Sequence, residues 1–502
     1  MGVEPALKCG LPQLAMSNHL ERNILNRGLD FLEKSYVSQL GIFRIHYSTT
    51  DENHSVDASE LIDGIPKYVF EAGIAADSAY HILIDEMGFL PPVPDNGIDG
   101  DELDIYIKNW GGTVYAYTYF DDAGSPTYLV IDNDFAEPGY TTHGLDAMRV
   151  TVAHEFFHMV QLRLSAPLGS LNGNTFWFEM SSVWFEDACY PEVNDYLAYT
   201  PYVLTNPSPA LDGFGIAMYG HGLFCKVLDK ELGWNGDTHI VKDIWSHLSA
   251  NDALDVINQR LESNLWNSSL ENQMGHYSLY NFFVGSRSKA QEYYEDANLM
   301  TAFEIQETEI VQPFPFSINL MIPPLQNIYR AYRPLEYGQH YVSLNHDTPD
   351  NFKGWILQED PFSNMEITDQ LTHDYTSFGD IGNEHIVYFA LSNAQSDATL
   401  DISFSFEGET IPLKDALISS FPNPLYINSN ILSLKVMVDA SGNFPLTLYN
   451  INGQEILWEY RQISEGIHFI DIEFPTHLSS GVYFVKLNLY TASIVHRIIW
   501  IK

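Results

Sequence analysis

Two histidines separated by three residues constrain this chain more than any other feature of its sequence. The segment from about Gly144 to Ser165 has the apolar spacing of an α-helix, and it contains His154 and His158. Residues four apart lie one helical turn above the other, so both imidazoles project from the same face. The opposite face carries large apolar side chains, whereas the other positions of the histidine face are small or polar: Ala147, Thr151 and Gln161. We therefore predict a helix that is anchored in a core by one face and borders a cleft with the other.

Paired imidazoles on one helix face are typical of zinc binding. A catalytic Zn²⁺ takes three protein ligands and leaves one position for water. Glu155 follows His154 and points about 100° further around the helix axis, so it would flank the metal ion instead of binding it. A carboxylate in that place is suited to act as a general base. The alternative is an ordinary helix with two surface histidines and a carboxylate.

A second predicted helix, near Phe176–Cys189, supplies further acidic side chains. Glu179 and Glu186 are seven residues apart and share a face if the segment is helical. We predict Glu179 as the third zinc ligand. Glu186 or Asp187 would then accept a hydrogen bond from an imidazole N–H and orient that ring. The alternative is that these carboxylates are solvated side chains of an acidic protein.

The charge of the chain excludes several classes of function. Among its 502 residues, 24 Lys and Arg stand against 66 Asp and Glu, which gives a net charge of −42. Such a surface repels nucleic acids and anionic membranes, so we expect no nucleic-acid partner. No apolar run approaches the ~18 residues of a membrane span. Residues 1–12 lack the pattern of a signal peptide, and we expect that a leader was trimmed or left out of the sequence.

The cysteines allow at most one internal disulfide. They are Cys9, Cys189 and Cys225, and none of their spacings predicts a thiolate metal site.

The order of predicted elements indicates a multidomain chain with three parts. Strand-like runs precede the two helices described above and further helices up to about residue 297, so residues 1–304 are predicted to form an α+β domain. From about Glu304, prolines interrupt the helical patterns, and short alternating runs predict an all-β sandwich over residues 305–410. Residues 411–502 contain short strands again, with Asn452-Gly453 as a strong hairpin signal, and we predict an Ig-like β-sandwich for this part.

The run His154-Glu155-Phe156-Phe157-His158, followed about twenty residues later by Glu179 in an aromatic-flanked helix, resembles the gluzincin clan of metallopeptidases. It is similar in particular to a group of secreted bacterial metalloproteases that continue with a Trp-x-Glu segment and an Asn-Asp-Tyr stretch, here Asn194-Asp195-Tyr196. The resemblance covers roughly residues 1–300. Many gluzincins place Gly or Ala after the ligand glutamate, whereas Met180 and Ser181 follow it here.

This resemblance implies a zincin-like fold and zinc-dependent hydrolysis of peptide bonds. By position, His154, His158 and Glu179 would be the zinc ligands and Glu155 the catalytic base. Such a reaction needs a further donor for the developing oxyanion. Related enzymes commonly use a Tyr or His from the region that here contains Tyr219 and His221, so Tyr219 is the first candidate and His221 the second. The alternative for Tyr219 is a packed tyrosine at a helix start.

The C-terminal stretch resembles the sorting domain of the type IX secretion system. The similarity follows Phe421–Pro424, Leu448–Gln454, Leu478–Lys486 and the closing Arg497–Lys502 in order. It implies export through the periplasm and the outer membrane of a Bacteroidetes-type bacterium, with the type IX machinery as a partner, and release or attachment at the cell surface. The alternative is a generic terminal β-sandwich used for binding.

Three further interpretations remain open at this level. The acidic, glycine-containing loop Asp95–Glu102 has the composition of a Ca²⁺ loop, but an EF-hand would need acids at other positions, and an acidic turn is the simpler interpretation. An aminopeptidase would need an acid that binds the free amine of its substrate, and the sequence does not identify one. In a different class, the chain would be a surface adhesin or a glycan- or protein-binding protein with a non-catalytic metal site.

Overall fold

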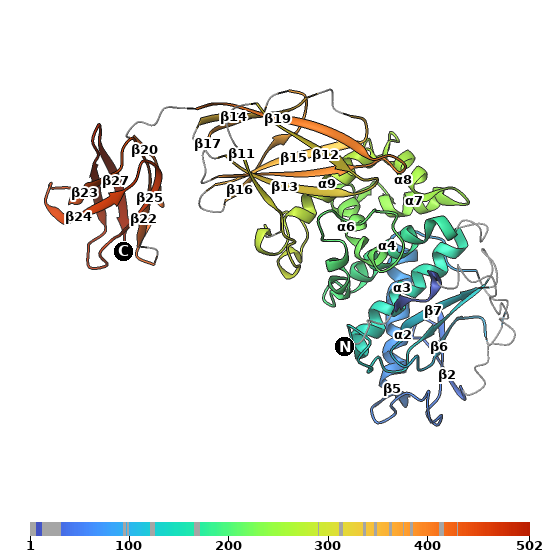
Figure 1. Ribbon diagram of the computed structural model, residues 1–502. Helices are drawn as coiled ribbons and strands as arrows, with labels where there is room; N and C mark the ends of the chain where they lie inside the picture. The colour runs from blue at the N-terminus through green and yellow to red at the C-terminus, as the bar shows by residue number, and fades with distance from the viewer. Residues whose placement is uncertain are drawn as a thin grey trace.

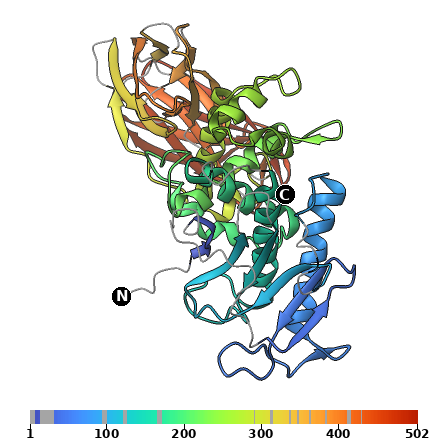
Figure 2. The same ribbon diagram turned by 90° about the vertical axis from the view of Figure 1, so that its right-hand side faces the viewer.

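The computed structural model describes residues 7–12, 32–93, 97, 100–120, 126–164, 171–289, 291–310, 315–334, 338–345, 349–360, 364–374, 376–381, 385–410, 416–428 and 430–502. The chain is multidomain, with an α/β region followed by two β-sandwiches (Figure 1). In Figure 2 the first sheet lies below a layer of helices, and the middle sandwich lies above that layer.

The first region is built on a six-stranded mixed sheet with the order β1-β7-β8-β6-β3-β2. Strands β3, β6 and β8 are parallel. Strand β2 is antiparallel to β3 and β7 is antiparallel to β8, while β1 is added parallel to the outer edge of β7. The bounds are β1 (Leu7–Cys9), β2 (Lys34–Val37), β3 (Phe43–Tyr47), β6 (Leu103–Ile107), β7 (Val114–Phe120) and β8 (Thr127–Ile131), with a small hairpin of β4 (Leu61–Ile62) and β5 (Ile65–Pro66).

Two long helices pack against this sheet and against each other. Helix α2 (Lys67–Tyr80), which the π-turn η2 (His81–Glu86) continues, connects the parallel strands β3 and β6. That connection is of the α/β type, so the predicted α+β order describes only the helices that follow the sheet. Helix α3 (Gly144–Leu164) contacts β7 and β8.

The predicted cleft along the histidine face of α3 is not present in the structure. Between Ala147 and Leu162, every residue of the helix except Arg149 is buried, including Thr151 and Gln161. The histidine face is covered because α4 (Leu171–Cys189) packs along it and because β1 lies beside it at the edge of β7. A helix covered on both sides needs partners for each of its polar side chains.

The helices that follow α4 form the rest of the layer. Helix α4 packs against α3 and α6, and α9 packs against both α6 and the middle sandwich. Helices α8 and α9 begin at side-chain caps, since Asp252 accepts N–H bonds from Leu254 and Asp255, and Ser269 accepts one from Asn272. The elements are η4 (Asp195–Ala198), η5 (Thr200–Tyr202), α5 (Ala217–Gly220), α6 (Gly222–Glu231), β9 (Trp234–Asn235), β10 (Thr238–His239), α7 (Ile240–Leu248), α8 (Ala253–Leu261), α9 (Leu270–Phe282), η6 (Gly285–Arg287) and η7 (Ala297–Leu299).

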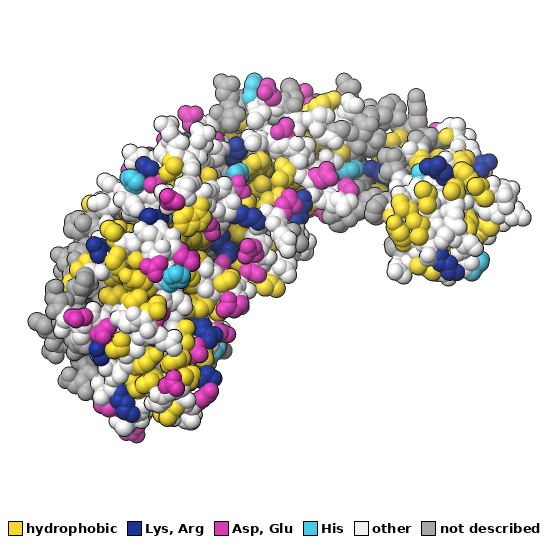
Figure 3. Space-filling view, turned by 180° about the vertical axis from the view of Figure 1, so that it is seen from behind, with side chains coloured by type: hydrophobic (Ala, Val, Ile, Leu, Met, Phe, Trp, Pro, Cys, Tyr) yellow, Lys and Arg dark blue, Asp and Glu magenta, His cyan; other side chains and the backbone are white. Residues whose placement is uncertain are grey.

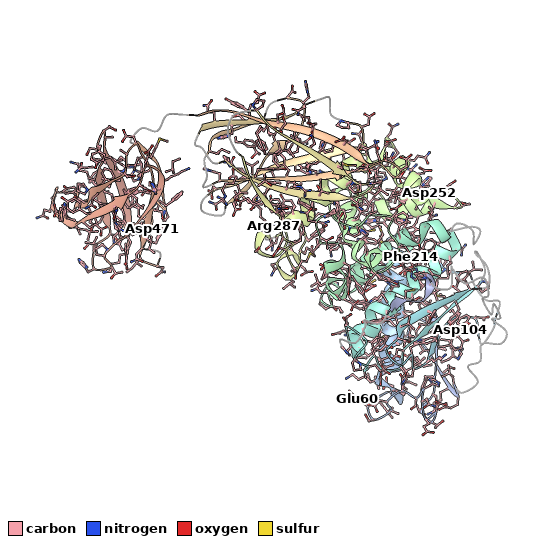
Figure 4. The ribbon with its side chains drawn as sticks, viewed as in Figure 1. Glu60, Asp104, Phe214, Asp252, Arg287 and Asp471 are labelled. Carbon is pink, nitrogen blue, oxygen red and sulfur yellow. The ribbon has the colours of Figure 1, made fainter. Side chains whose placement is uncertain are left out.

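The middle sandwich consists of a five-stranded sheet, β11-β13-β18-β15-β16, and a four-stranded sheet, β12-β19-β14-β17. Its first sheet shares an apolar core with the helical layer, to which Tyr329 and Leu357 belong. Arg287, labelled in Figure 4, lies at this junction and donates to the carbonyl oxygens of Phe282 and Phe303. The strands are β11 (Glu307–Ile310), β12 (Phe316–Ile322), β13 (Asn327–Pro334), β14 (Gly338–Leu344), β15 (Phe352–Glu359), β16 (Met365–Gln370), β17 (Thr376–Ile381), β18 (Ile386–Asn393) and β19 (Leu400–Thr410).

The C-terminal sandwich has a hydrophobic core of its own and stands apart at the left of Figure 1. Its sheets have the orders β20-β22-β25 and β21-β27-β26-β23-β24. The predicted Asn452-Gly453 turn joins β23 to β24, and Gly453 has a φ of 76°, which few other residues adopt without strain. The strands are β20 (Ala416–Phe421), β21 (Leu425–Tyr426), β22 (Ile431–Val438), β23 (Gly442–Asn450), β24 (Glu455–Ile463), β25 (Gly466–Glu473), β26 (Gly481–Asn488) and β27 (Ser493–Ile501).

The large negative charge is not gathered in one patch on the face seen in Figure 3. Acidic side chains are scattered there among basic and apolar ones. The side chains described on this face therefore form no strongly charged docking surface.

Candidate metal centre

Three side chains from α3 and α4 meet at one point inside the first region. His154 Nε2 and His158 Nε2 are 3.0 Å apart, and Glu179 places one carboxylate oxygen 3.2 Å from the first and the other 3.5 Å from the second. In a tetrahedral zinc site with bonds of 2.0–2.1 Å, neighbouring ligand atoms lie about 3.3 Å apart. The three observed separations fall around that value, so the residues present have the spacing that a zinc ion requires.

The outer nitrogen of each imidazole is bound to an acceptor. His154 Nδ1 is 2.6 Å from Glu186 Oε1, and His158 Nδ1 is 2.6 Å from Gln161 Oε1. The orientation of the Gln161 amide is fixed because its Nε2 donates to Phe178 O and to the hydroxyl oxygens of Ser181 and Ser182.

Both Nδ1 atoms therefore carry a hydrogen, and in the neutral rings both Nε2 atoms carry a lone pair. Two lone pairs and a carboxylate then face one another at 3.0–3.5 Å with no proton between them. This arrangement repels itself unless a cation sits among the three atoms, and neutral imidazoles with their other N–H engaged are how zinc ligands are held.

The pKa values of the cluster also point to a cation. Burial opposes a charge on His154, but hydrogen bonds to Glu179 and Glu186 outweigh it and raise the pKa of this imidazole to about 9. Burial equally opposes the charge of Glu179, yet the two histidines lower its pKa to about 2. The pocket thus stabilises positive charge at the meeting point, which a proton on His154 or a divalent metal ion supplies.

Glu155 is held beside this point by the sheet. Its Oε2 accepts a hydrogen bond of 2.5 Å from Thr118 Oγ1 on β7, while its Oε1 is buried and accepts none. A carboxylate with one oxygen fixed and the other free is arranged to take a proton from a group placed next to it. Thr118 was not predicted, since β7 itself was not recognised from the sequence.

Of the two alternatives Glu186 and Asp187, the structure brings only Glu186 to the cluster. Asp187 instead forms an ion pair with Lys226 of α6. Gln161, which orients the second imidazole, was recognised as part of the histidine face but not assigned a role.

Of the two candidate oxyanion donors, Tyr219 lies near the cluster and His221 does not. The ring of Tyr219 lies 6.4 Å from that of His154, and burial together with the charge of Glu179 raises the pKa of its hydroxyl well above the usual value. His221 faces away: its Nδ1 is 3.0 Å from Tyr277 Oη and its Nε2 is 3.0 Å from Ala210 O. With both ring nitrogens engaged elsewhere, His221 is not available to an oxyanion at the cluster, and Tyr219 is the better candidate.

His221 leads to a prediction for acid stability. Burial lowers its pKa to about 4, and the hydrogen bond to Ala210 O offsets this only in part. The unfolded chain therefore binds a proton near pH 6.5 that the folded chain does not, so stability is complete above pH 6.5 and falls as the pH drops through 4. The difference corresponds to about 3 kcal/mol. Urea unfolding between pH 7 and 4 should show this loss in the wild type and less of it in His221→Gln; equal slopes would contradict the assignment.

Two residues at the cluster come from the N-terminal strand β1. Cys9 places its Sγ so that it, the two histidine nitrogens and a Glu179 oxygen all lie within 4.8 Å of one another. The spacing of the cysteines in the sequence does not reveal this placement of Cys9, because β1 pairs with a strand more than one hundred residues away. Cys9, Cys189 and Cys225 are all free thiols.

Lys8 is the second of these residues. It is fully buried, and its Nζ lies 2.9 Å from Glu186 Oε2 and 2.5 Å from Asp195 Oδ2. Burial opposes its charge, but Asp195 and Glu186 outweigh that and raise its pKa. Lys8 thus neutralises the carboxylate that orients His154.

The cluster is closed to solvent: His154, Glu155, His158 and Glu179 are each 0% exposed. A cleft of about 780 Å³ lies elsewhere, between residues 286–289 and strands β15 and β16, and none of the cluster lines it. Access to the cluster therefore requires a segment to move.

The loop Asp95–Glu102, for which an acidic turn was the simpler interpretation than a Ca²⁺ loop, is only partly within the described residues, since Asp95, Asn96, Ile98 and Asp99 lie outside them. Glu102 is described, and its carboxylate accepts hydrogen bonds from Arg44 at 3.0–3.1 Å.

Comparison with known proteins identifies the C-terminal part. Residues 419–502 match the family described as "Secretion system C-terminal sorting domain". No curated protein matches the chain. Several solved structures match part of the chain at low TM-scores. The ectodomain of the C. elegans fusion protein EFF-1 is 12% identical, with 25% of this chain and 30% of that one covered and a TM-score of 0.14.

Two bacterial structures are similarly distant. The adhesin domain of Epf from Streptococcus pyogenes is 10% identical, with 38% of this chain and 75% of that one covered and a TM-score of 0.13. A β-glucuronidase of Parabacteroides merdae is 9% identical, with 35% and 27% covered and a TM-score of 0.14. The chain thus spans less than a third of the EFF-1 ectodomain, and likeness at these TM-scores carries no argument about fold or activity.

The sorting domain places the protein outside the cell. It directs export by the type IX secretion machinery, with which the chain interacts, and leads to an extracellular or cell-surface location. Within the described residues, no helix combines the length and the apolar character that crossing a bilayer requires.

Proposed function

We propose that this exported protein is a zinc-dependent endopeptidase with a zincin-like first domain, in which His154, His158 and Glu179 bind the metal ion. The observation that carries the proposal is the pair of imidazoles whose Nδ1–H groups are fixed outward while both Nε2 atoms and the Glu179 carboxylate converge.

Buried charge supports the same proposal. Four carboxylates are buried in and around the cluster: Glu155, Glu179, Glu186 and Asp195. The ammonium group of Lys8 pairs with Glu186 and Asp195. Buried carboxylates are stable only when paired or bound to metal, and a dication next to Glu179 and Glu155 would compensate the other two.

The residues have roles that follow from their positions. Zinc, when bound, polarises a carbonyl and lowers the pKa of a water molecule towards neutrality. Glu155 accepts the proton of the attacking water through its free Oε1 and passes it to the leaving amine. Tyr219 donates its O–H to the developing oxyanion, and Glu186 keeps His154 in the tautomer that binds metal.

One observation favours a second candidate, a binding protein with a non-catalytic metal site. The cluster is buried and has a thiol beside it, and closed four-ligand sites are typical of structural zinc. Glu155 argues for catalysis, because a structural site has no use for a buried carboxylate with an unbonded oxygen.

The experiment that separates the two candidates is a cleavage assay on zinc-loaded full-length protein. Wild type and Cys9→Ala, which lacks the thiol beside the cluster, are incubated with casein and with a peptide library. The products are identified by mass spectrometry. Internal cleavage sites support an endopeptidase, and successive loss of N-terminal residues would indicate an aminopeptidase instead. If both chains hold stoichiometric zinc and neither cleaves any substrate, the binding-protein candidate stands.

Tyr219→Phe tests the oxyanion role. Removing one donor to a transition-state oxyanion typically costs about 10²–10³ in kcat. We expect a loss of that order in kcat, with KM and zinc content little changed. Tyr199→Phe is the matched control, because Tyr199 is also buried and its ring lies 5.3 Å from that of Tyr219. An equal loss in both variants would show a packing effect and remove Tyr219 from the mechanism.

A further inference from the structure

Strand β1 lies where it closes the candidate centre. It pairs with the free edge of β7, with Leu7 opposite Val114 and Cys9 opposite Ala116, and Gly10 N–H continues the pairing to Ala116 O at 3.1 Å. Two residues further along β7, Thr118 holds Glu155. The strand therefore runs beside the segment of the sheet whose Thr118 holds the proposed base.

The side chain of Cys9 is directed into the cluster. Its Sγ is within 4.8 Å of the ligand atoms of His154, His158 and Glu179, and Leu11 N–H donates to that sulfur at 3.2 Å. A tetrahedral centre with a Zn–S bond of about 2.3 Å would set the sulfur about 3.6 Å from the histidine nitrogens. The thiol thus stands near the fourth position of the site.

The backbone of Cys9 also meets a group with a proposed catalytic role. Its carbonyl oxygen accepts a hydrogen bond of 3.5 Å from Tyr219 Oη. The same hydroxyl is proposed to bind the oxyanion of a scissile peptide. The carbonyl oxygen of Cys9 therefore occupies the hydroxyl group of Tyr219, which a substrate carbonyl would need as its hydrogen-bond donor.

Two further contacts fasten the strand. The ammonium group of Lys8 is enclosed by Glu186 and Asp195, and it lies 4.9 Å from the centroid of the Tyr115 ring. At Gly10 a Cβ would fall 1.8 Å from a ring atom of Tyr117, so only glycine allows the strand to seat against β7. Lys8, Cys9 and Leu11 are each 1% exposed.

We propose that Cys9 is a fourth protein ligand of the metal ion and that β1 thereby holds the centre in a latent state. The proposal rests on the zinc site of the proposed function. With two imidazoles, a carboxylate and a thiolate, zinc has four protein ligands and no position for water. The thiol releases its proton to solvent when sulfur binds. Activation is the reverse exchange: sulfur leaves and takes up a proton, water enters, and β1 withdraws from β7 and from Tyr219.

The first test uses cobalt, which substitutes for zinc in such sites and reports sulfur ligation by charge-transfer absorption in the near ultraviolet. Full-length protein loaded with one equivalent of Co²⁺ should show this band in the wild type and in Cys225→Ala, and lose it in Cys9→Ala. Cys225 is the matched control because it is also a fully buried free thiol, on α6. X-ray absorption of the zinc form should show one sulfur at about 2.3 Å.

The outcomes separate this proposal from the proposed function. Bound metal without a sulfur signal overturns the ligand role of Cys9 and leaves the three-ligand site intact. Absence of bound metal in wild type and Cys9→Ala alike overturns the metal centre itself and this inference with it.

The second test addresses latency. Cys9→Ala removes the ligand, and Gly10→Val prevents β1 from seating while it keeps the thiol. Activity scales with the fraction of molecules whose site is open, so each variant should raise peptide cleavage by about tenfold or more over wild type and Cys225→Ala. Gly10→Val should also lose the cobalt charge-transfer band at unchanged cobalt content. Unchanged cleavage in both variants, beside active wild type, overturns the latent state.

Discussion

Glu155→Gln is expected to lower kcat/KM for peptide cleavage by about 10²–10⁴-fold, the range that general acid–base catalysis contributes. The amide can still accept the hydrogen bond from Thr118, so the fold and the zinc content should not change. It cannot accept a proton from the attacking water. The rates are measured in chains that also carry Cys9→Ala, so that closure of the site by β1 does not mask the effect.

Glu71→Gln is the control for this comparison. Glu71 is on α2 and accepts a hydrogen bond of 2.9 Å from Arg149. Arg149 is on α3, the helix that carries Glu155, and is partly exposed. The same chemical change there should leave kcat/KM within a factor of about two, since surface changes away from a site are usually small. If Glu155→Gln cleaves peptides as fast as the control, Glu155 is not the base, and the proposed mechanism is wrong.

Removal of zinc is expected to lower the thermal stability of the first region by a large amount. A ligand that binds only the folded state at a thousand times its Kd contributes about 4 kcal/mol, which corresponds to a fall in Tm on the order of 10 °C for a region of this size. The physical reason is that two imidazole lone pairs and the buried Glu179 carboxylate lose the cation between them.

Differential scanning calorimetry with and without a chelator measures this shift. His158→Ala, which removes one of the ligands, serves as the control and should show little response to chelator. The calorimetric trace should also contain a separate transition for the C-terminal sandwich, whose core is independent of the metal cluster. A first-region transition that does not move when zinc is removed would contradict the role of the metal ion in holding α3 to α4.

The helices of the site were predictable because their signals are local. The 3.6-residue spacing around His154 and His158 gave α3 within one residue of its observed ends, and the spacing of Glu179 and Glu186 put both on the face of α4 that meets α3. The type of each residue then restricted its chemistry. The choice between Glu186 and Asp187 needed the structure, because adjacent residues on a helix face different neighbours.

The contributions of the sheet were not predictable in the same way. Strand β7 alternates tyrosines with buried small and apolar residues, so it lacks the contrast between apolar and polar positions that marks a half-exposed strand. Its pairing with β1 joins residues more than one hundred positions apart. Cys9 and Lys8 reach the cluster through that pairing. Thr118 reaches it through the place of β7 beside β8 and α3, and the histidine face is buried by α4 as well as by β1.

The C-terminal sorting domain could be recognised in the sequence because such a domain contains short motifs in a fixed order. The match over residues 419–502 confirms it. The hydrolysis of peptide bonds remains a proposal that rests on the geometry of the first region.

The most direct test of the central claim is the zinc content of the purified full-length protein after loading and removal of excess metal. We expect one zinc ion per chain in the wild type and a large loss in His158→Ala, because the ion is held between α3 and α4 by His154, His158 and Glu179. A wild-type chain that retains no zinc, or a His158→Ala chain that retains as much as the wild type, would contradict the account.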